Sequence, residues 1–317
     1  MIDANTKLSI IIPALNESAH LPATLAIVKK LFGNCDAVIV ADNGSTDGTP
    51  EIAKRFGAKV TIHPGVTIGE LRNQGAKLSE AELLVFIDAD VHLDQSWPEN
   101  FEKVVKELTL NPLTITGSRC RAASQTSFVN RYWYSRLNTE KNKNYINSGH
   151  LIVTRELFNK IAGFSSELTT GEDYDFCQRA LKAGATLKPT PELIAWHEGY
   201  PASLQGFMQR EMWHGRNEYK TLTLFLESKV AIISTCHLLI LLLTLIALLF
   251  TTSLFIPVIY VLMTAIILAG LTVQKFGFVD FRLFLGSAYL YYFYLLARGL
   301  AWQFNKKRPA ARNMVKT

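Results

Sequence analysis

The chain has 317 residues, of which 49% are hydrophobic, and a formal net charge of +6. That charge suits a membrane surface as well as a nucleic acid, but no zinc-finger spacing, aromatic RNA-binding motif or basic recognition helix is present, so we expect no nucleic-acid partner. The four cysteines, Cys35, Cys120, Cys177 and Cys236, have neither metal-site nor disulfide-framework spacing, which favours reduced thiols.

Strand-like and helix-like segments alternate over the first 111 residues. Short apolar or β-branched runs predict strands, and apolar residues at helical spacing predict helices. The expected elements are strands at 7–15, 37–42, 58–63 and 82–90, and helices at 18–32, 50–57, 68–79 and 97–111. This alternation predicts an α/β fold with a mostly parallel sheet and helices on both faces.

Polar clusters follow three of these strands, at 13–17, 42–47 and 88–90. Ligands of such sheets bind beyond the carboxyl ends of the strands, so we expect the clusters to converge on one crevice. Asp88 and Asp90 would repel each other unless a divalent cation lay between them, and carboxylate oxygens suit Mg²⁺ or Mn²⁺. An isolated Asp-x-Asp can equally be a turn or a cap. Neither a Walker A loop nor a G-x-G-x-x-G fingerprint is present.

Two uncharged runs, at about 230–250 and 254–271, have the length needed to cross a hydrocarbon core of roughly 30 Å. A third run at about 283–300, rich in tyrosine, suits either a third span or an interfacial helix. A basic tail follows at 305–317. We therefore expect a domain at 1–228 and a membrane region at 229–317.

The basic residues at the outer ends of the first two runs predict a cytoplasmic side. They are Lys229, Lys275 and Arg282. By the positive-inside rule these ends, and the domain at 1–228, lie in the cytoplasm. The start of the chain lacks the features of a signal peptide. The expected location is the inner (plasma) membrane, as a multi-pass protein.

Six blocks resemble, in order over residues 7–217, the successive motifs of family-2 glycosyltransferases with the GT-A fold. They are IIPALNE (11–17), VADNGSTDGT (40–49), GELRNQGA (69–76), FIDADV (86–91), NSGHLIVTRELFNKIAGF (147–164) and GEDYDFCQRALKAG (171–184). The resemblance implies a GT-A domain that transfers a sugar from a nucleotide-sugar donor with inversion at the anomeric carbon.

The resemblance also implies a set of donor and metal residues. Those expected to contact the nucleotide-sugar are Pro13, Ala14, Asn16, Glu17, Asp42, Asn43, Arg72 and Asp88. Family members often have two acids where this chain has Asp42 and Asn43, so Asp42 has the greater weight. Arg72 would reach the base or the diphosphate, although a solvated helix charge is the alternative. The expected metal ligands are Asp90, Asp88 and His197, with Mn²⁺ or Mg²⁺ as the cofactor; a structural role is the alternative for His197.

The same resemblance assigns Asp173 as the catalytic base and Glu172 as its supporting neighbour, with Asp175 as a rival. Gln209, Arg210 and Trp213 match part of an acceptor-binding element of processive members, but Met212 departs from that element. The alternative for this segment is an amphipathic helix at about 203–220 that lies on the membrane.

The leading hypothesis is a metal-dependent, membrane-bound glycosyltransferase of cell-envelope polysaccharide biosynthesis. Its acceptor would be lipid-linked, a polyprenyl phosphate or a polyprenyl-diphosphate saccharide, with membrane lipids as further partners. The alternatives are a processive polysaccharide synthase, a non-catalytic membrane adaptor that retains the fold, and a nucleotidyltransferase. The number of hydrophobic segments is too small for the export channel of a processive synthase. The acids of the site are all present, which argues against an adaptor, and the hydrophobic tail argues against a nucleotidyltransferase.

Overall fold

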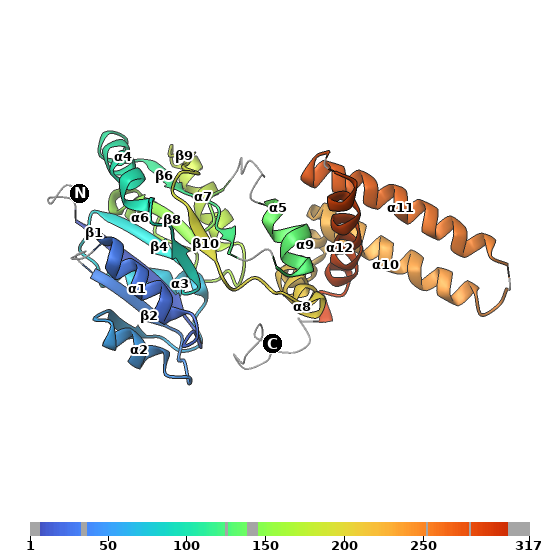
Figure 1. Cartoon of the computed structure of the whole chain (residues 1–317), viewed down its shortest axis with the longest axis horizontal. Helices are drawn as coiled ribbons and strands as arrows, with labels where there is room; N and C mark the ends of the chain where they lie inside the picture. The colour runs from blue at the N-terminus through green and yellow to red at the C-terminus, as the bar shows by residue number, and fades with distance from the viewer. Residues whose placement is uncertain are drawn as a thin grey trace. The chain divides into compact units, whose positions relative to one another are not determined.

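The computed structural model describes residues 7–32, 37–123, 126–137, 145–251, 253–278 and 280–303 (Figure 1). The chain divides into two compact units. The first unit comprises Met1–Ala123 and Lys141–Gly199, and the second comprises Ser124–Glu140 and Tyr200–Thr317. The domain boundary expected near residue 228 stays a prediction.

A seven-stranded sheet forms the centre of the first unit, in the order β3-β2-β1-β4-β8-β6-β9. Its strands are β1 (Leu8–Ala14), β2 (Ala37–Asp42), β3 (Lys59–Ile62), β4 (Leu83–Ile87), β6 (Thr114–Gly117), β8 (His150–Thr154) and β9 (Thr186–Pro189). β1, β2, β3 and β4 are parallel to one another, and β6 is parallel to β9, whereas β8 runs antiparallel to both β4 and β6. The predicted α/β fold with a mostly parallel sheet is therefore confirmed.

Helices cover both faces of this sheet because successive strand residues point to opposite sides. Ile10 and Ile12 of β1 belong to one core with residues of α1 and α4. Ile11 belongs to a second core with residues of α3, α6 and α7. The helices of this unit are α1 (Leu21–Phe32), α2 (Thr49–Arg55), α3 (Ile68–Lys77), α4 (Trp97–Leu110), α6 (Arg155–Lys160) and α7 (Glu172–Lys182).

The strand order reverses between β1 and β4, because β2 and β3 follow on one side of β1 and β4 lies on the other. Such a switch point opens a crevice beyond the carboxyl ends of the two strands. β1 ends at Ala14 and β4 at Ile87, so the polar segments that follow each strand border this crevice.

A second, three-stranded sheet was not expected from the sequence. It consists of β5 (Val91–Leu93), β10 (Ala195–His197) and β7 (Arg121–Ala122), in that order. β10 pairs antiparallel with β5 and parallel with β7. This small sheet brings residue 197 next to the segment that follows β4.

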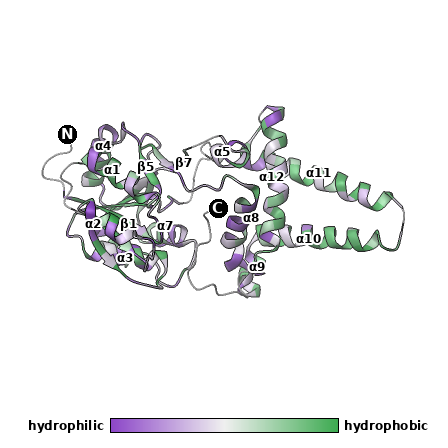
Figure 2. Ribbon diagram, turned by 60° about the horizontal axis from the view of Figure 1, so that its bottom comes forward, coloured by the Kyte–Doolittle hydropathy of each residue, from purple (hydrophilic) through white to green (hydrophobic). Residues whose placement is uncertain are grey.

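The second unit is helical. Its elements are a π-helical turn η1 (Asn130–Tyr134), α5 (Ser135–Leu137), α8 (Leu204–Gly215), a 3₁₀ turn η2 (Arg216–Tyr219), α9 (Leu222–Glu227), α10 (Lys229–Ala247), α11 (Phe255–Phe276) and α12 (Phe281–Gly299). Among the described residues, α10 and α11 are long and apolar enough to cross a membrane, and Figure 2 shows both as predominantly hydrophobic. α12 does not meet that criterion, and the basic tail expected at 305–317 lies outside the described residues.

Helix α12 packs inside the second unit, whereas α10 and α11 expose large apolar side chains. Arg136 donates to the Ser287 hydroxyl of α12 at 2.9 Å and to the Phe276 carbonyl at 3.1 Å. Near the end of α12, Arg298 pairs with Glu218. These buried polar contacts tie α12 to the segments around it.

Candidate active site

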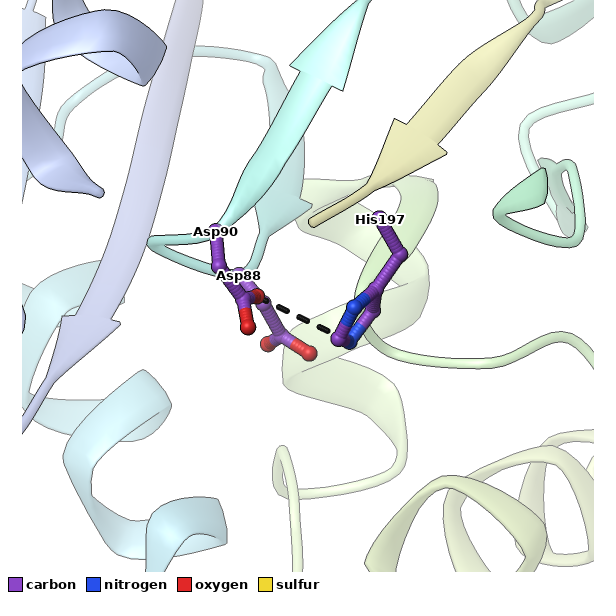
Figure 3. A group of neighbouring side chains, drawn as sticks. All are labelled: Asp88, Asp90 and His197. Carbon is purple, nitrogen blue, oxygen red and sulfur yellow. Dashed lines mark ion pairs between the residues drawn. The ribbon is translucent and has the colours of Figure 1, made fainter. Parts of the chain in front are cut away.

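Three potential metal ligands, Asp88, Asp90 and His197, come together at the end of β4 (Figure 3). Asp88 and Asp90 lie between β4 and β5, and His197 is the last residue of β10. One ligand atom from each lies within 4.8 Å of the others, and His197 Nε2 is 3.6 Å from Asp90 Oδ1. Two carboxylates and an imidazole suit a divalent ion such as Mn²⁺. We call these three residues the metal-ligand group.

Two glycines make room for these carboxylates. A Cβ at Gly199 would lie 1.9 Å from Asp90 Oδ2, and one at Gly149 would lie 2.7 Å from Asp88 Oδ2. The backbone N–H of Gly199 also donates to His197 Nδ1 at 3.0 Å, which turns Nε2 towards Asp90. The group therefore fits a cation in a cradle that side chains at these two positions would fill.

Arg72 joins the metal-ligand group to the start of α7. Its guanidinium is 1% exposed and donates to Asp88 Oδ1 at 2.7 Å and to Glu172 Oε1 at 3.0 Å. Burial lowers the pKa of Arg72, but the charges of Asp88 and Glu172 raise it, with a net upward shift. Arg72 is therefore a buried, paired cation, and the alternative of a solvated charge on the helix surface is wrong.

The start of α7 presents two acids with different surroundings. Glu172 is buried and accepts hydrogen bonds from Arg72 and from the Ser148 hydroxyl, the latter at 3.3 Å. Asp173 accepts from the Tyr174 backbone N–H at 2.8 Å and from the Asn147 amide at 3.1 Å. Burial, reinforced by the charge of Glu172, raises the pKa of Asp173 to about 6. Such a pKa suits a general base near neutral pH.

The third acid of this segment is already paired. Asp175 Oδ2 lies 2.8 Å from Arg179 Nη2, one helical turn further on, and accepts a hydrogen bond from Arg179 Nε at 2.8 Å. Among the described residues, Asp173 forms no ion pair with a Lys or Arg side chain. Of the two rivals for the role of base, Asp173 therefore has the carboxylate without a cation partner.

The two loops after β1 and β2 are bonded together. The Asn16 backbone N–H donates to the Ser45 hydroxyl at 2.8 Å, and the Thr46 N–H donates to Asn16 Oδ1 at 2.9 Å. Asn16 has a φ of +55°, a left-handed conformation that asparagine tolerates better than most residues. The sequence-predicted residues Pro13, Ala14, Asn16, Glu17, Asp42 and Asn43 thus lie on two adjoining strand ends.

Asp42 is fully buried and holds its own turn. Oδ1 accepts hydrogen bonds from the backbone N–H groups of Gly44 at 2.9 Å and Ser45 at 2.7 Å, and Oδ2 accepts one from the Ser45 hydroxyl at 2.5 Å. Asn43 donates its amide to the Val66 carbonyl at 2.9 Å, while its Oδ1 is buried and has no hydrogen-bond partner within the described segments. A contact of either residue with a nucleotide stays a prediction.

The three residues expected to bind an acceptor lie on α8, in the second unit. The Arg210 guanidinium is 5.4 Å from the ring centre of Tyr134 and 4.9 Å from that of Tyr200, and these rings are stacked at 4.2 Å. Trp213 is partly exposed, with Arg216 3.9 Å above its ring. The predicted acceptor role of Gln209, Arg210 and Trp213 stays a prediction.

The sequence did not single out Asn147, Ser148 or the two cradle glycines as site residues. Asn147 contacts Asp173 and also accepts from the Gly149 N–H at 2.8 Å through Oδ1. Three of the four residues belong to the NSG stretch immediately before β8. The available signals were two polar residues and a glycine before a buried strand, and the place of this stretch in one of the six blocks of the resemblance.

Two family models match the chain. One, described as "Glycosyl transferase family 2", matches residues 9–161. The other, described as "Glycosyl transferase family group 2", matches residues 118–304.

Curated relatives match over shorter stretches. Glycosyltransferase AglE of Haloferax volcanii is 26% identical over 210 residues, covering 61% of this chain and 67% of the relative. An uncharacterized glycosyltransferase of Haemophilus influenzae is 30% identical over 186 residues, covering 55% and 62%. One from Mycobacterium tuberculosis is 32% identical over 116 residues, covering 37% and 50%. The chain thus spans between half and about two thirds of these relatives.

One solved structure is similar over nearly the whole chain. It is a mannosyltransferase from Pyrobaculum calidifontis in complex with GDP-Man and Mn²⁺, with a TM-score of 0.62 and 17% identity. The match covers 95% of this chain and 88% of that one. At this identity the similarity shows the fold, which is GT-A.

Proposed function

Because the chain belongs to glycosyl transferase family group 2, whose model matches more than half of it, we propose that it is a membrane-bound, metal-dependent inverting glycosyltransferase. It moves a sugar from a nucleotide-sugar donor to a lipid-linked acceptor. One observation carries this proposal: Arg72 ties the metal-ligand group to the acidic start of α7 within one unit. A donor site and a base are thereby assembled together.

The donor would lie against the ends of β1, β2 and β4, where the two bonded loops meet the metal-ligand group. Asp88, Asp90 and His197 would hold a divalent ion. When bound, such an ion would act as a Lewis acid and stabilise the negative charge of the leaving nucleoside diphosphate. The mannosyltransferase with the same fold, solved with GDP-Man and Mn²⁺, supports this assignment.

Asp173 would act as the base. As the acceptor oxygen forms its bond to the anomeric carbon and the bond to the diphosphate oxygen breaks, the hydroxyl proton passes to the Asp173 carboxylate. Its raised pKa supports this role, as does the absence of a Lys or Arg side chain paired with it in the part of the chain that the structure describes. The Asn147 amide orients the carboxylate, and Glu172 remains paired with Arg72.

Arg72 would position both carboxylates. Nη1 and Nη2 are each engaged by a carboxylate, so a change at Arg72 would disturb the metal-ligand group and the start of α7 together. A direct contact of Arg72 with the base or the diphosphate stays a prediction.

The second unit would anchor the enzyme in the inner (plasma) membrane through α10 and α11. A membrane anchor favours an acceptor that is itself in the bilayer, such as a polyprenyl phosphate or a polyprenyl-diphosphate saccharide. A processive synthase is less well supported, because among the described helices only two pass the test for a membrane span. A non-catalytic adaptor is less well supported because every acid of the proposed site is present.

The first test is a calorimetric titration of the detergent-solubilised full chain with UDP, GDP, CDP and dTDP, with and without Mn²⁺. We expect one nucleotide to bind, and only when the metal is present. That result would identify the class of donor. If none binds to a folded sample, the adaptor becomes the better description and the proposed function fails.

The second test is the pH dependence of turnover. A base must be deprotonated to accept a proton, and Asp173 has a pKa of about 6, so turnover should be constant well above pH 6 and fall about tenfold per pH unit well below it. Asp173→Asn should lower turnover by roughly 10²–10⁴-fold and leave nucleotide binding nearly unchanged. Unchanged turnover in this variant would remove Asp173 from the mechanism.

A further inference from the structure

A pocket of about 360 Å³ lies in the first unit, between α1 and the strands β5 and β10. Small-molecule sites usually measure about 300–1,000 Å³, so this pocket has room for one small ring. Its apolar lining includes Ile27 and Leu31 of α1, and its polar and aromatic lining comprises Lys30, His92, Asp94, Gln95, Trp196 and Glu198. None of these residues belongs to the metal-ligand group.

The pocket and the metal-ligand group use opposite faces of the same two strands. His92 and Trp196 are directly paired across β5 and β10, and the next pair along is Val91 with His197. Side chains alternate between the faces of a strand, so His92 and Trp196 share one face and His197 projects from the other. The pocket is therefore distinct from the proposed donor site.

One polar atom of the pocket lacks a partner. His92 Nε2 is buried and has no hydrogen-bond partner among the described residues, while Nδ1 of the same ring lies 3.5 Å from Glu198 Oε1. Buried polar groups are almost always hydrogen-bonded. This nitrogen is fully buried, so a ligand hydroxyl reaches it when the ring turns about its side-chain bonds. A hydroxyl both donates and accepts, and would then satisfy the nitrogen in either tautomer.

The pocket has no excess of positive charge that would favour an anion. Asp94 and Glu198 contribute two carboxylates, against the Lys30 ammonium and the Arg121 guanidinium, which lies 5.8 Å from the ring centre of Trp196. The indole of Trp196 is fixed by its N–H, which donates to Asp94 Oδ2 at 3.3 Å. Carboxylates accept hydrogen bonds and therefore suit a ligand with several hydroxyls. The aromatic ring and the alkyl side chains beside them suit a ligand with an apolar face.

We propose that this pocket binds a single saccharide ring. Glu198 and His92 hydrogen-bond its hydroxyls, and Trp196 packs against its apolar face. The Glu198 backbone N–H donates to the Asp90 carbonyl at 2.9 Å, so the pocket is directly bonded to the backbone of a proposed metal ligand. The inference rests on the chemistry of the lining and does not require the proposed catalytic function.

The test is saturation-transfer difference NMR on the full chain in nanodiscs, which avoid glycoside detergents. The probes are the methyl glycosides of glucose, mannose, galactose and N-acetylglucosamine, with sorbitol as an open-chain control. Each is measured alone and with saturating Mg²⁺, which is diamagnetic, and nucleoside diphosphate, which together occupy the proposed donor site. We expect transfer to at least one ring sugar and not to sorbitol, and we expect it to persist with the nucleotide present.

Variants locate the binding. Glu198→Ala and His92→Ala should each raise the dissociation constant about tenfold, because each removes a hydrogen bond at a charged or buried group. Glu167→Ala, a change at another exposed glutamate, should have no effect. Circular dichroism establishes that each variant is folded.

Three results would overturn the proposal: no transfer to any ring sugar, transfer abolished by the nucleotide, or equal affinity in folded Glu198→Ala and His92→Ala. Sugar binding in a chain that binds no nucleotide would uphold the pocket and overturn the proposed catalytic function. Nucleotide binding without sugar binding would do the reverse.

Discussion

The ends of β2 and β4 carry the same residue type in contrasting surroundings. Asp42, at the end of β2, accepts three hydrogen bonds from its own turn and is fully buried. After β4, Asp88 has one oxygen paired with Arg72, and Asp90 Oδ1 lies 3.6 Å from His197 Nε2. An aspartate that accepts hydrogen bonds from its own turn stabilises that loop. An aspartate that accepts no hydrogen bonds from its turn has a carboxylate available to bind a ligand. Residue type and strand position alone do not separate the two cases.

Removing an acid from the β4 end should have the largest effect on activity. Changes in residues behind a metal ligand typically cost about 10–100-fold, so Asp90→Ala should lower kcat/KM by more than about a hundredfold. Mn²⁺ binding, followed by electron paramagnetic resonance, should weaken in parallel. The melting temperature should change little, since the contact removed among the described residues is the 3.6 Å approach of His197 Nε2 to Asp90 Oδ1. An equal loss of nucleotide affinity with and without chelator would contradict metal ligation by Asp90.

Narrowing the space beside the same carboxylate should have a smaller effect. In Gly199→Ala the new methyl group would lie 1.9 Å from Asp90 Oδ2 unless the backbone moves. We expect Mn²⁺ affinity to fall by about 10–100-fold, as for other changes that displace a metal ligand. Gly270→Ala is the matched control, because a Cβ there meets no atom within 4 Å. Unchanged Mn²⁺ affinity in Gly199→Ala would show that Asp90 does not need this space.

At the β2 end the main effect should be on stability. Asp42→Ala leaves the backbone N–H groups of Gly44 and Ser45 without their acceptor, and an unsatisfied buried donor costs about 1–3 kcal/mol. We expect the free energy of unfolding of the first unit to fall by about that amount in urea titrations. Asp90→Ala provides the contrast. If Asp42→Ala were as stable as the wild type, the comparison between the two strand ends would fail.

The smallest effect is expected at Asp175, which is paired with Arg179 one turn along α7. Exposed pairs at this spacing contribute about 0.3–0.5 kcal/mol. Asp175→Asn should therefore lower stability by no more than that and leave turnover within about twofold of wild type, a change of about 0.4 kcal/mol. A large loss of turnover would instead favour Asp175 over Asp173 as the base.

The order of strands and helices in the first half could be predicted because each signal is local. Apolar runs, helical spacing and terminal signals such as Pro50 are all present within a few residues of sequence. The convergence of polar strand ends followed from the geometry of parallel sheets. In contrast, β8 lies antiparallel between β4 and β6, and β5 and β10 have three residues each. Neither feature has a local signature.

The sequence predicted which residues belong to the candidate site better than it predicted which of them pair with each other. Arg72 and Glu172 are 100 residues apart in sequence, and position 72 alone is compatible with a solvated helix charge. Asp42 accepts hydrogen bonds from backbone N–H groups of its own turn. Because nearly every residue has a backbone N–H group, the sequence does not indicate which of them will bond to a given carboxylate. The residue types of the site could thus be read from the motifs, but which carboxylates remain unsatisfied depends on the folded backbone.

The pairing of β10 with β5 also has a consequence for synthesis. His197 lies 107 residues after Asp90 (197 − 90), and a ribosome adds about 5–20 residues per second, so roughly 5–20 s separate the two. During that interval the nascent chain has both aspartates but lacks the imidazole of the metal-ligand group, as well as β10 itself. A fragment that ends before β10 contains the residues of the four parallel strands but lacks both His197 and Gly199, so it cannot complete the metal-ligand group.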